Sequence, residues 1–167
     1  DLDPAAPTMY ELAPSSIAAL NVISRGLGPP DLIGQSLGFI ARTARTHFSG
    51  KVNGWLAIDR EISGQVVERI NRTKPDFVFA ALTGIDKSSH SEGHDSAYVD
   101  RAMGIVDDTV AAIRSNAEEN GTWNDTHLWV VSDHGHSAVL EHERTTYISY
   151  PYEWTFAMLR DAAILHL

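Results

Sequence analysis

The chain of 167 residues contains no cysteine. Thiolate zinc sites, disulfide bonds and cysteine nucleophiles are therefore excluded. Basic residues are also scarce, because 13 Lys and Arg stand against 22 Asp and Glu, and the formal charge is −9. This balance argues against a surface that grips the phosphate backbone of nucleic acid. An acidic protein can still bind phosphate esters where metal ions supply positive charge, and the eight histidines are available as ligands.

Long hydrophobic runs are absent as well. No stretch approaches the roughly 20 apolar residues of a transmembrane helix, so we expect no membrane span in this segment. The hydrophobic fraction of 43% is enough for one core, and we expect a single domain over residues 1–167. The chain begins without Met, and its last residues, "WTFAMLRDAAILHL", stop inside an apolar pattern. We therefore expect it to be a fragment of a larger domain.

Three Asn-x-Thr sequons begin at Asn71, Asn120 and Asn124. Such sites are typical of secreted proteins and of proteins that pass through the secretory pathway. The sequons favour a secreted, periplasmic or secretory-pathway location.

The second half of the chain predicts a strand, a helix and a strand. Residues 75–82, "PDFVFAAL", are a β-branched and aromatic run typical of a strand covered on both faces. Residues 96–118 predict a helix capped by Asp95 or Ser96. Residues 126–132, "THLWVVS", predict a second strand, parallel to the first. The apolar stripe expected on the helix consists of Val99, Met103, Val106, Val110 and Ile113.

The first half carries fainter signals of the same kind. A helix is predicted over 59–72, with Asp59 as its cap and with Ile62, Val66 and Ile70 facing inward. A short helix over 6–13, a strand over 17–24 and a helix over 35–46 are also predicted. Together these elements predict an α/β fold, a mostly parallel sheet flanked by helices.

Acidic residues and histidines follow both strands of the second half. Asp86 and His90 come after the first strand, and Asp133 and His134 after the second. The carboxyl ends of parallel strands meet at one edge of a sheet, so we expect the two sets to lie close together. A spacing of four places Asp86 and His90 on one helical face, where carboxylate and imidazole suit zinc. The adjacent Asp133 and His134 either share one ion from a kinked backbone or serve separate functions.

A simpler interpretation applies to each of these residues alone. A single strand-end Asp is usually a cap or a turn former, and we interpret Asp95, beside Ser96, in that way. Two Asp/His sets on neighbouring strand ends are harder to explain as caps. The pattern therefore favours a metal site, although the interpretation in which all these residues only cap and solvate loops remains open.

The stretch "PDFVFAALTGIDKSSHSEGHDSAYVDRAMGIVDDTVAAI", followed by "HLWVVSDHGHS", resembles the metal-binding core of the alkaline phosphatase superfamily. It is most similar to the type I phosphodiesterase/nucleotide pyrophosphatase branch. The shared pattern is an apolar strand, Asp-x3-His-x2-Gly, a helix, and a second apolar strand that ends in Ser-Asp-His-Gly. The resemblance covers roughly residues 75–137.

The resemblance implies a two-zinc hydrolase of phosphate esters, acting on a small-molecule ester or a nucleotide. Asp86 and His90 would bind one zinc ion, and Asp133 and His134 the other. The chain departs from its relatives at His94, where they often carry proline, and at His136, where they often carry methionine. The further candidates for a metal or substrate contact are His94, His136, His142 and His166.

The resemblance also implies a Ser or Thr nucleophile, which we do not identify in this sequence. Thr8, Ser15 and Ser16 lack the upstream metal-binding Asp of the family, so we expect the nucleophile before residue 1, in a larger catalytic domain. Alternatives within the fold are a sulfatase, a phosphonate hydrolase and a phosphoglycerate mutase. Another alternative is a catalytically inactive remnant or a metal-binding module.

Overall fold

The computed structural model describes residues 3–21 and 23–136. The chain divides into two compact units, Asp1–Ser132 and Asp133–Leu167. Every described helix and strand belongs to the first unit, and only residues 133–136 of the second unit are described.

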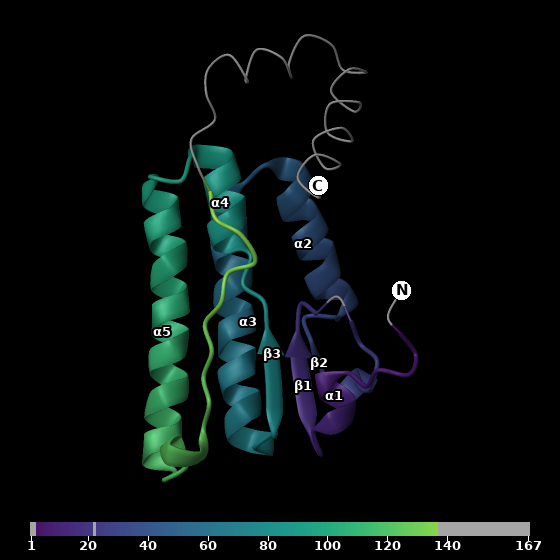
Figure 1. Cartoon of the computed structure of the whole chain (residues 1–167). Helices are drawn as coiled ribbons and strands as arrows, with labels where there is room; N and C mark the ends of the chain where they lie inside the picture. Colours follow the sequence, from purple (N-terminus) through teal and green to yellow (C-terminus); the bar gives the residue numbers. More distant parts are fainter. Residues whose placement is uncertain (1–2, 22, 137–167) are drawn as a thin grey trace. The chain divides into compact units, whose positions relative to one another are not determined.

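A small parallel sheet forms the centre of the first unit (Figure 1). Its strands are β1 (Ser16–Ala19), β2 (Leu32–Ile33) and β3 (Phe77–Ala80), in the order β2-β1-β3. Both pairings are parallel, with Ile17 opposite Val78 and Ala18 opposite Leu32. The strand predicted over 17–24 is therefore present but much shorter.

Helices make up most of the rest of this unit. They are α1 (Met9–Leu12), α2 (Leu37–Ser49), α3 (Val52–Thr73), α4 (Gly84–Glu92) and α5 (Ala97–Glu119), with 3₁₀ turns η1 (Pro29–Asp31) and η2 (Trp123–Asp125). The predicted α/β class is confirmed, as are the helices expected over 6–13, 35–46 and 96–118. Among the described residues, no helix combines the length and the apolar character needed to cross a bilayer.

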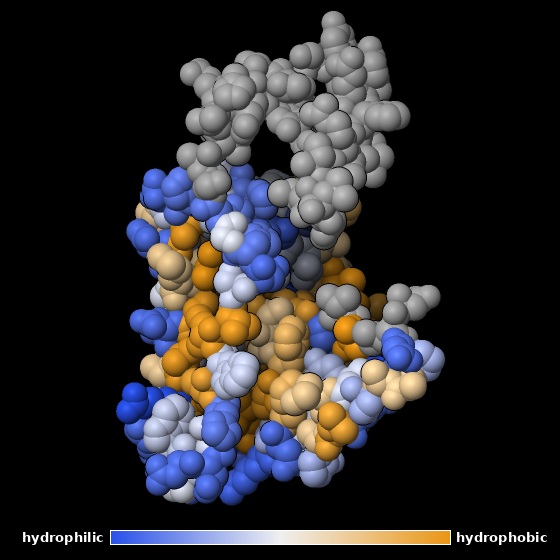
Figure 2. All heavy atoms as spheres, in the orientation of Figure 1, coloured by the Kyte–Doolittle hydropathy of each residue, from blue (hydrophilic) through white to orange (hydrophobic). Residues whose placement is uncertain are grey.

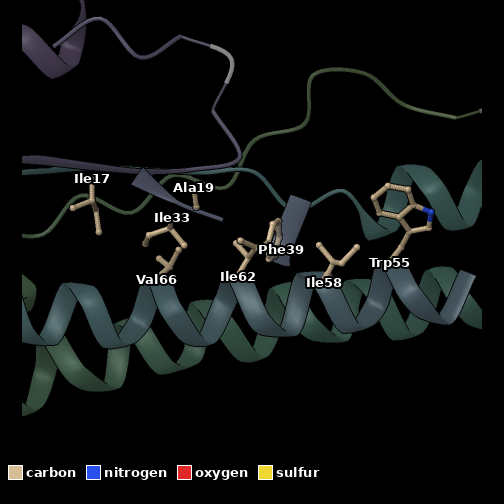
Figure 3. Packing of buried hydrophobic residues seen from close by; sticks show 8 residues of the cluster. All are labelled: Ile17, Ala19, Ile33, Phe39, Trp55, Ile58, Ile62 and Val66. Carbon is tan, nitrogen blue, oxygen red and sulfur yellow. The ribbon is translucent and has the colours of Figure 1, made fainter. Parts of the chain in front are cut away.

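The larger core lies between α3 and the sheet (Figure 3). Ile62 of α3 is fully buried there and Val66 nearly so, while Ile70 packs at the margin. The inward orientation predicted for these three side chains is confirmed. The remaining buried members of this core are Ile17, Ala19, Ile33, Phe39, Trp55 and Ile58.

A second core joins α3 to α4 and α5. Leu56 of α3 packs with Ala102 and Ile105 of α5, and Ile85 of α4 lies against them. The predicted stripe on α5 is wrong at Met103, which is 49% exposed. The reason is that the small Ala102 faces inward instead and lets α5 approach the start of α4 closely.

Helix α3 begins at Val52, and the prediction that Asp59 caps it is wrong. Val52, Trp55 and Leu56 are all buried, so the apolar face of the helix extends through about two turns before Asp59. Asp59 lies inside α3 and is fully buried. Its carboxylate accepts hydrogen bonds from the amides of Thr83 (3.0 Å) and Gly84 (2.7 Å), so it caps α4 instead.

Strand β3 is not covered on both faces, contrary to the sequence-based prediction. Val78 packs against the core under α3, and the Phe77 ring contacts Tyr10 of α1 on the opposite face, with 5.4 Å between ring centroids. Phe79, on the same face as Phe77, is 42% exposed. The four-residue α1 is too short to reach it, which leaves the end of this face open.

The strand predicted over 126–132 is also wrong. The structure describes all seven residues, and they form an extended segment without strand pairing (Figure 1). Trp129 and Val131 are more than 80% exposed, and Figure 2 shows apolar surface on this face of the molecule. A β-branched run forms a strand only where it pairs with a neighbour, and here it makes no ladder with β3.

Replacing Ile62 by Ala tests the larger core. We expect the Ile62→Ala variant to lose about 2 to 5 kcal/mol of unfolding free energy, because it removes three methyl or methylene groups from a fully buried site. Urea unfolding measures the change. Leu37→Ala is the matched control, because Leu37 is 87% exposed, and its effect should stay within about 0.5 kcal/mol. Equal losses in the two variants would contradict this assignment of the core.

Asp59 should give the stability a defined pH dependence. Burial raises the pKa of Asp59 above its ordinary value of 3.8, and the hydrogen bonds from Gly84 and Thr83 lower it only in part. The folded state therefore keeps a proton that the unfolded chain has already released. The contribution of Asp59 to stability should fall as the pH rises from 3.8 through the raised pKa.

Urea unfolding of the wild type and of Asp59→Asn at several pH values measures this effect. The Asn variant does not titrate at this position. We expect its stability relative to the wild type to improve as the pH rises across that window and to level off above it. A difference that is constant, or that changes in the opposite direction, would contradict the raised pKa.

Candidate metal site

Helix α4 places Asp86 and His90 just beyond the carboxyl end of β3. Only residues 81–83 separate the strand from the helix. The inner face of α4 carries Ser88 and Ser89, both buried. Asp86 and His90 lie one turn apart on the more exposed face, with side chains 32% and 66% exposed. Their location after a strand and on one helical face agrees with the sequence analysis.

The donor atoms of these two side chains are close together. Asp86 Oδ1 lies 3.2 Å from His90 Nε2. Two ligands of a tetrahedral zinc ion, each bound at 2.0 to 2.1 Å, are about 3.3 Å apart. The pair therefore fits two positions in the shell of a single ion. In the absence of an ion, the same contact is an ordinary pair of helix neighbours at i and i+4.

Lys87 also contacts the Asp86 carboxylate. Its Nζ lies 2.9 Å from Asp86 Oδ2 and 6.0 Å from the centre of the Trp55 ring. The ammonium group thus contacts one carboxylate oxygen while the other faces His90. Sequence analysis missed Lys87, because adjacent side chains on a helix diverge by about 100° and only a long, flexible one can reach back.

Asp59 supports the first turn of the same helix from α3. The amides of Thr83 and Gly84 are the first two donors at the α4 N-terminus, and both bond to its carboxylate. A negative charge at this end of a helix is also favoured by the helix dipole. The sequence signal was present, because Asp59 looked like a cap, but nothing local showed which helix it caps.

The described part of the second unit holds the other Asp/His set. The Asp133 carboxylate accepts a hydrogen bond from the His134 amide at 3.1 Å, and Oδ2 lies 3.7 Å from His134 Nε2. The two side chains therefore lie near each other, and whether they share one ion or serve separate functions stays open. The His136 ring lies against that of His134, with 5.4 Å between centroids. His136, a secondary candidate in the sequence, thus neighbours a primary one.

The remaining candidates fall into two groups. His94 lies beyond the Gly93 C-cap of α4, with its Nε2 3.2 Å from Asp95 Oδ2. His142 and His166 lie outside the described residues. Asp86 and His90 belong to one compact unit and Asp133 and His134 to the other, so the expected sharing of one site by the two sets stays a prediction.

The hydroxyl groups near the N-terminus have structural partners or are enclosed. Thr8 Oγ1 caps α1 by accepting from the Glu11 amide, and Ser15 Oγ donates to Asp76 Oδ2 at 2.7 Å. Ser16 Oγ is buried at the start of β1. None of the three lies in α4 or directly after β3, and the position of the nucleophile stays a prediction.

Comparison with known protein families relates most of the chain to one of them. Residues 16–152 match the family described as type I phosphodiesterase / nucleotide pyrophosphatase. No curated protein and no solved structure matches the chain. The matched range includes β1 to α5 and both Asp/His sets, in agreement with the resemblance read from the sequence. Because the match spans well over half of its residues, the chain belongs to the type I phosphodiesterase / nucleotide pyrophosphatase family.

Proposed function

We propose that this chain is part of a metal-dependent hydrolase of phosphate esters, of the phosphodiesterase/nucleotide pyrophosphatase type, with two zinc ions. Asp86 and His90 would hold one ion, and Asp133 and His134 the other. The substrate would be a small-molecule phosphate ester or a nucleotide. The observation that carries the proposal is the 3.2 Å separation of Asp86 Oδ1 and His90 Nε2 in a chain of this family.

The charge of the chain supports the involvement of metal ions. With a formal charge of −9, the protein repels an anionic ester unless positive charge is concentrated at the site. Bound zinc ions supply that charge, polarise the phosphoryl group and stabilise the leaving oxygen. Carboxylate and imidazole together form a donor set that suits zinc.

The side chains around Asp86 would hold its carboxylate in place. Lys87 contacts Oδ2 and leaves Oδ1 directed at His90. With one oxygen engaged, the carboxylate loses rotational freedom, which favours binding through the other. The Trp55 ring, 6.0 Å from Lys87 Nζ, limits the positions of the ammonium group in turn.

Asp133 and His134 would act as the second pair. Because the His134 amide donates to Asp133 Oδ1, the local backbone and the carboxylate are fixed together. Nδ1 of His134 lies 3.1 Å from the carbonyl oxygen of Gly135. If Nδ1 carries the proton, it donates to that carbonyl and leaves Nε2 free of a proton and able to ligate.

Metal affinity tests the first pair. We expect Asp86→Ala and His90→Ala each to weaken zinc binding by about a hundredfold or more, because each removes a ligand and loss of a supporting contact alone typically costs about 10- to 100-fold. Isothermal titration calorimetry with Zn²⁺ measures the dissociation constants. His127→Ala is the matched control, because this exposed histidine lies outside both sets. Equal affinities in the wild type and both site variants would overturn the assignment of this pair.

Hydrolysis of an aryl phosphodiester tests the reaction. The protein is tested with the upstream segment in which we expect the Ser or Thr nucleophile. When loaded with zinc, it should release 4-nitrophenol from bis(4-nitrophenyl) phosphate, lose this activity with EDTA and regain it when zinc is restored. Asp133→Ala should lower the rate at least about a hundredfold, because a carboxylate ligand of the second ion is lost. Turnover that is insensitive to the chelator would contradict the zinc mechanism. Zinc binding without any turnover would instead favour the inactive metal-binding remnant.

A further inference from the structure

Asp59 is a buried carboxylate that no described cation neutralises. It is fully buried in the middle of α3, and none of the described Lys, Arg or His side chains is ion-paired with it. A carboxylate without a cationic partner is costly to bury, so such a group needs hydrogen bonds to its charged form. The structure shows two, from the amides of Thr83 and Gly84.

Both hydrogen bonds end on the helix that carries Asp86 and His90. Helix α4 has no cap of its own, because the Thr83 side chain makes no capping bond and its Oγ1 is buried without a hydrogen-bond partner among the described residues. The first amides of α4 are therefore satisfied from another helix. The start of α4 is fixed to α3 and not to the loop that precedes it.

Gly84 makes this contact possible. A Cβ atom added at Gly84 would lie 2.4 Å from Asp59 Oδ2 and 3.6 Å from Ala102 Cβ. The carboxylate is enclosed and has no open space into which to retreat. Any side chain at position 84 must therefore separate the carboxylate from the amides.

We propose that Asp59 is a positioning residue for the metal site, which fixes the start of α4 so that Asp86 and His90 face one ion together. This inference rests on the proposed function. Asp86 is two residues beyond the amide of Gly84, and His90 is one turn further. Asp86 lies in the first turn of α4 and His90 in its last turn, so if the first turn loses its helical geometry, Asp86 leaves the helical face that His90 keeps. The 3.2 Å separation of their donor atoms depends on both pointing the same way.

Two variants disturb the contact in different ways. Asp59→Asn keeps the shape of the side chain but replaces one acceptor oxygen by an NH₂ group, which cannot accept an amide hydrogen. Gly84→Ala keeps the carboxylate and inserts a methyl group 2.4 Å from Oδ2. The Ala variant also favours the helical state, so it tests the contact even if the Asn variant unfolds.

Ser63→Ala is the matched control. Ser63 lies one turn after Asp59 on α3, and its Oγ accepts a hydrogen bond from Thr109 Oγ1 of α5 at 2.8 Å. The variant removes a buried hydrogen bond from the same helix without touching α4. Its loss of stability therefore shows what a purely structural defect in α3 does to metal binding.

Calorimetric titration of the full chain with Zn²⁺ measures the effect, beside thermal unfolding of the same samples. We expect Asp59→Asn and Gly84→Ala to weaken zinc binding about tenfold or more, as is typical when a supporting contact of a metal ligand is lost. Ser63→Ala should lower the melting temperature and leave the zinc affinity unchanged. The double variant should bind zinc about as weakly as either single variant, because both act through one contact.

Amide hydrogen exchange gives a second readout. The Thr83 and Gly84 amides should be protected in the wild type and in Ser63→Ala. At least one of them should exchange at least about tenfold faster in Asp59→Asn, where an acceptor is missing. Wild-type exchange at both amides of the Asn variant would overturn the capping role.

The outcomes separate this inference from the function on which it rests. If the wild type binds zinc and His90→Ala weakens the binding while Asp59→Asn and Gly84→Ala do not, the positioning role is overturned and the proposed function stands. If Ser63→Ala weakens binding as much as Asp59→Asn, the effect is general destabilisation and the positioning role is overturned again. If the wild type binds no zinc, the proposed function is overturned and the positioning role with it.

Discussion

The geometry of the candidate site depends on one buried carboxylate. Asp59 loses the hydration of its charge inside the protein, and among the described residues the amides of Thr83 and Gly84 donate the hydrogen bonds that replace it. It lies in α3 between Leu56, which packs toward α5, and Ile62, which packs toward the sheet. Helix α3 belongs to both cores of the unit, so a contact anchored on it ties α4 to the element that the two cores share.

The elements with strong periodicity could be predicted from the sequence. Helix α5 and the inward side chains Ile62 and Val66 followed from apolar spacing, and the parallel sheet followed from alternating strands and helices. Asp59 was predicted to cap the helix that contains it, which is wrong, because the helix that it caps begins 25 residues later in the chain. Distances of that kind arise from tertiary packing, which periodicity does not encode.

The errors have a common physical origin. Met103 was expected inside because it is apolar, yet the shape of the contact with α4 selects the smaller Ala102. Residues 126–132 have the composition of a strand, but a strand exists only through hydrogen bonds to a neighbour. In both cases the sequence indicates a preference, for burial at Met103 and for strand structure at 126–132. Whether that preference is realised depends on the neighbouring element.

The candidate ligands Asp86 and His90 could be identified from the sequence, whereas the residues that contact or support them could not. Asp86 and His90 are recognisable because chemistry restricts metal ligands to few residue types and a helix restricts their spacing. Lys87 and Asp59 belong to no such pattern, because any cation or buried acid can hold a ligand in place. Their contributions are visible only as distances, such as the 2.9 Å from Lys87 Nζ to Asp86 Oδ2.

Residues 126–132, which form no strand in the described structure, have a consequence for how the protein behaves in solution. β3 is an edge strand of the described sheet, and the exposed Trp129, Val130 and Val131 belong to the same unit. An open sheet edge and a β-prone apolar run are complementary, and a second molecule can supply either one. This segment is therefore prone to strand pairing between molecules when the protein is concentrated.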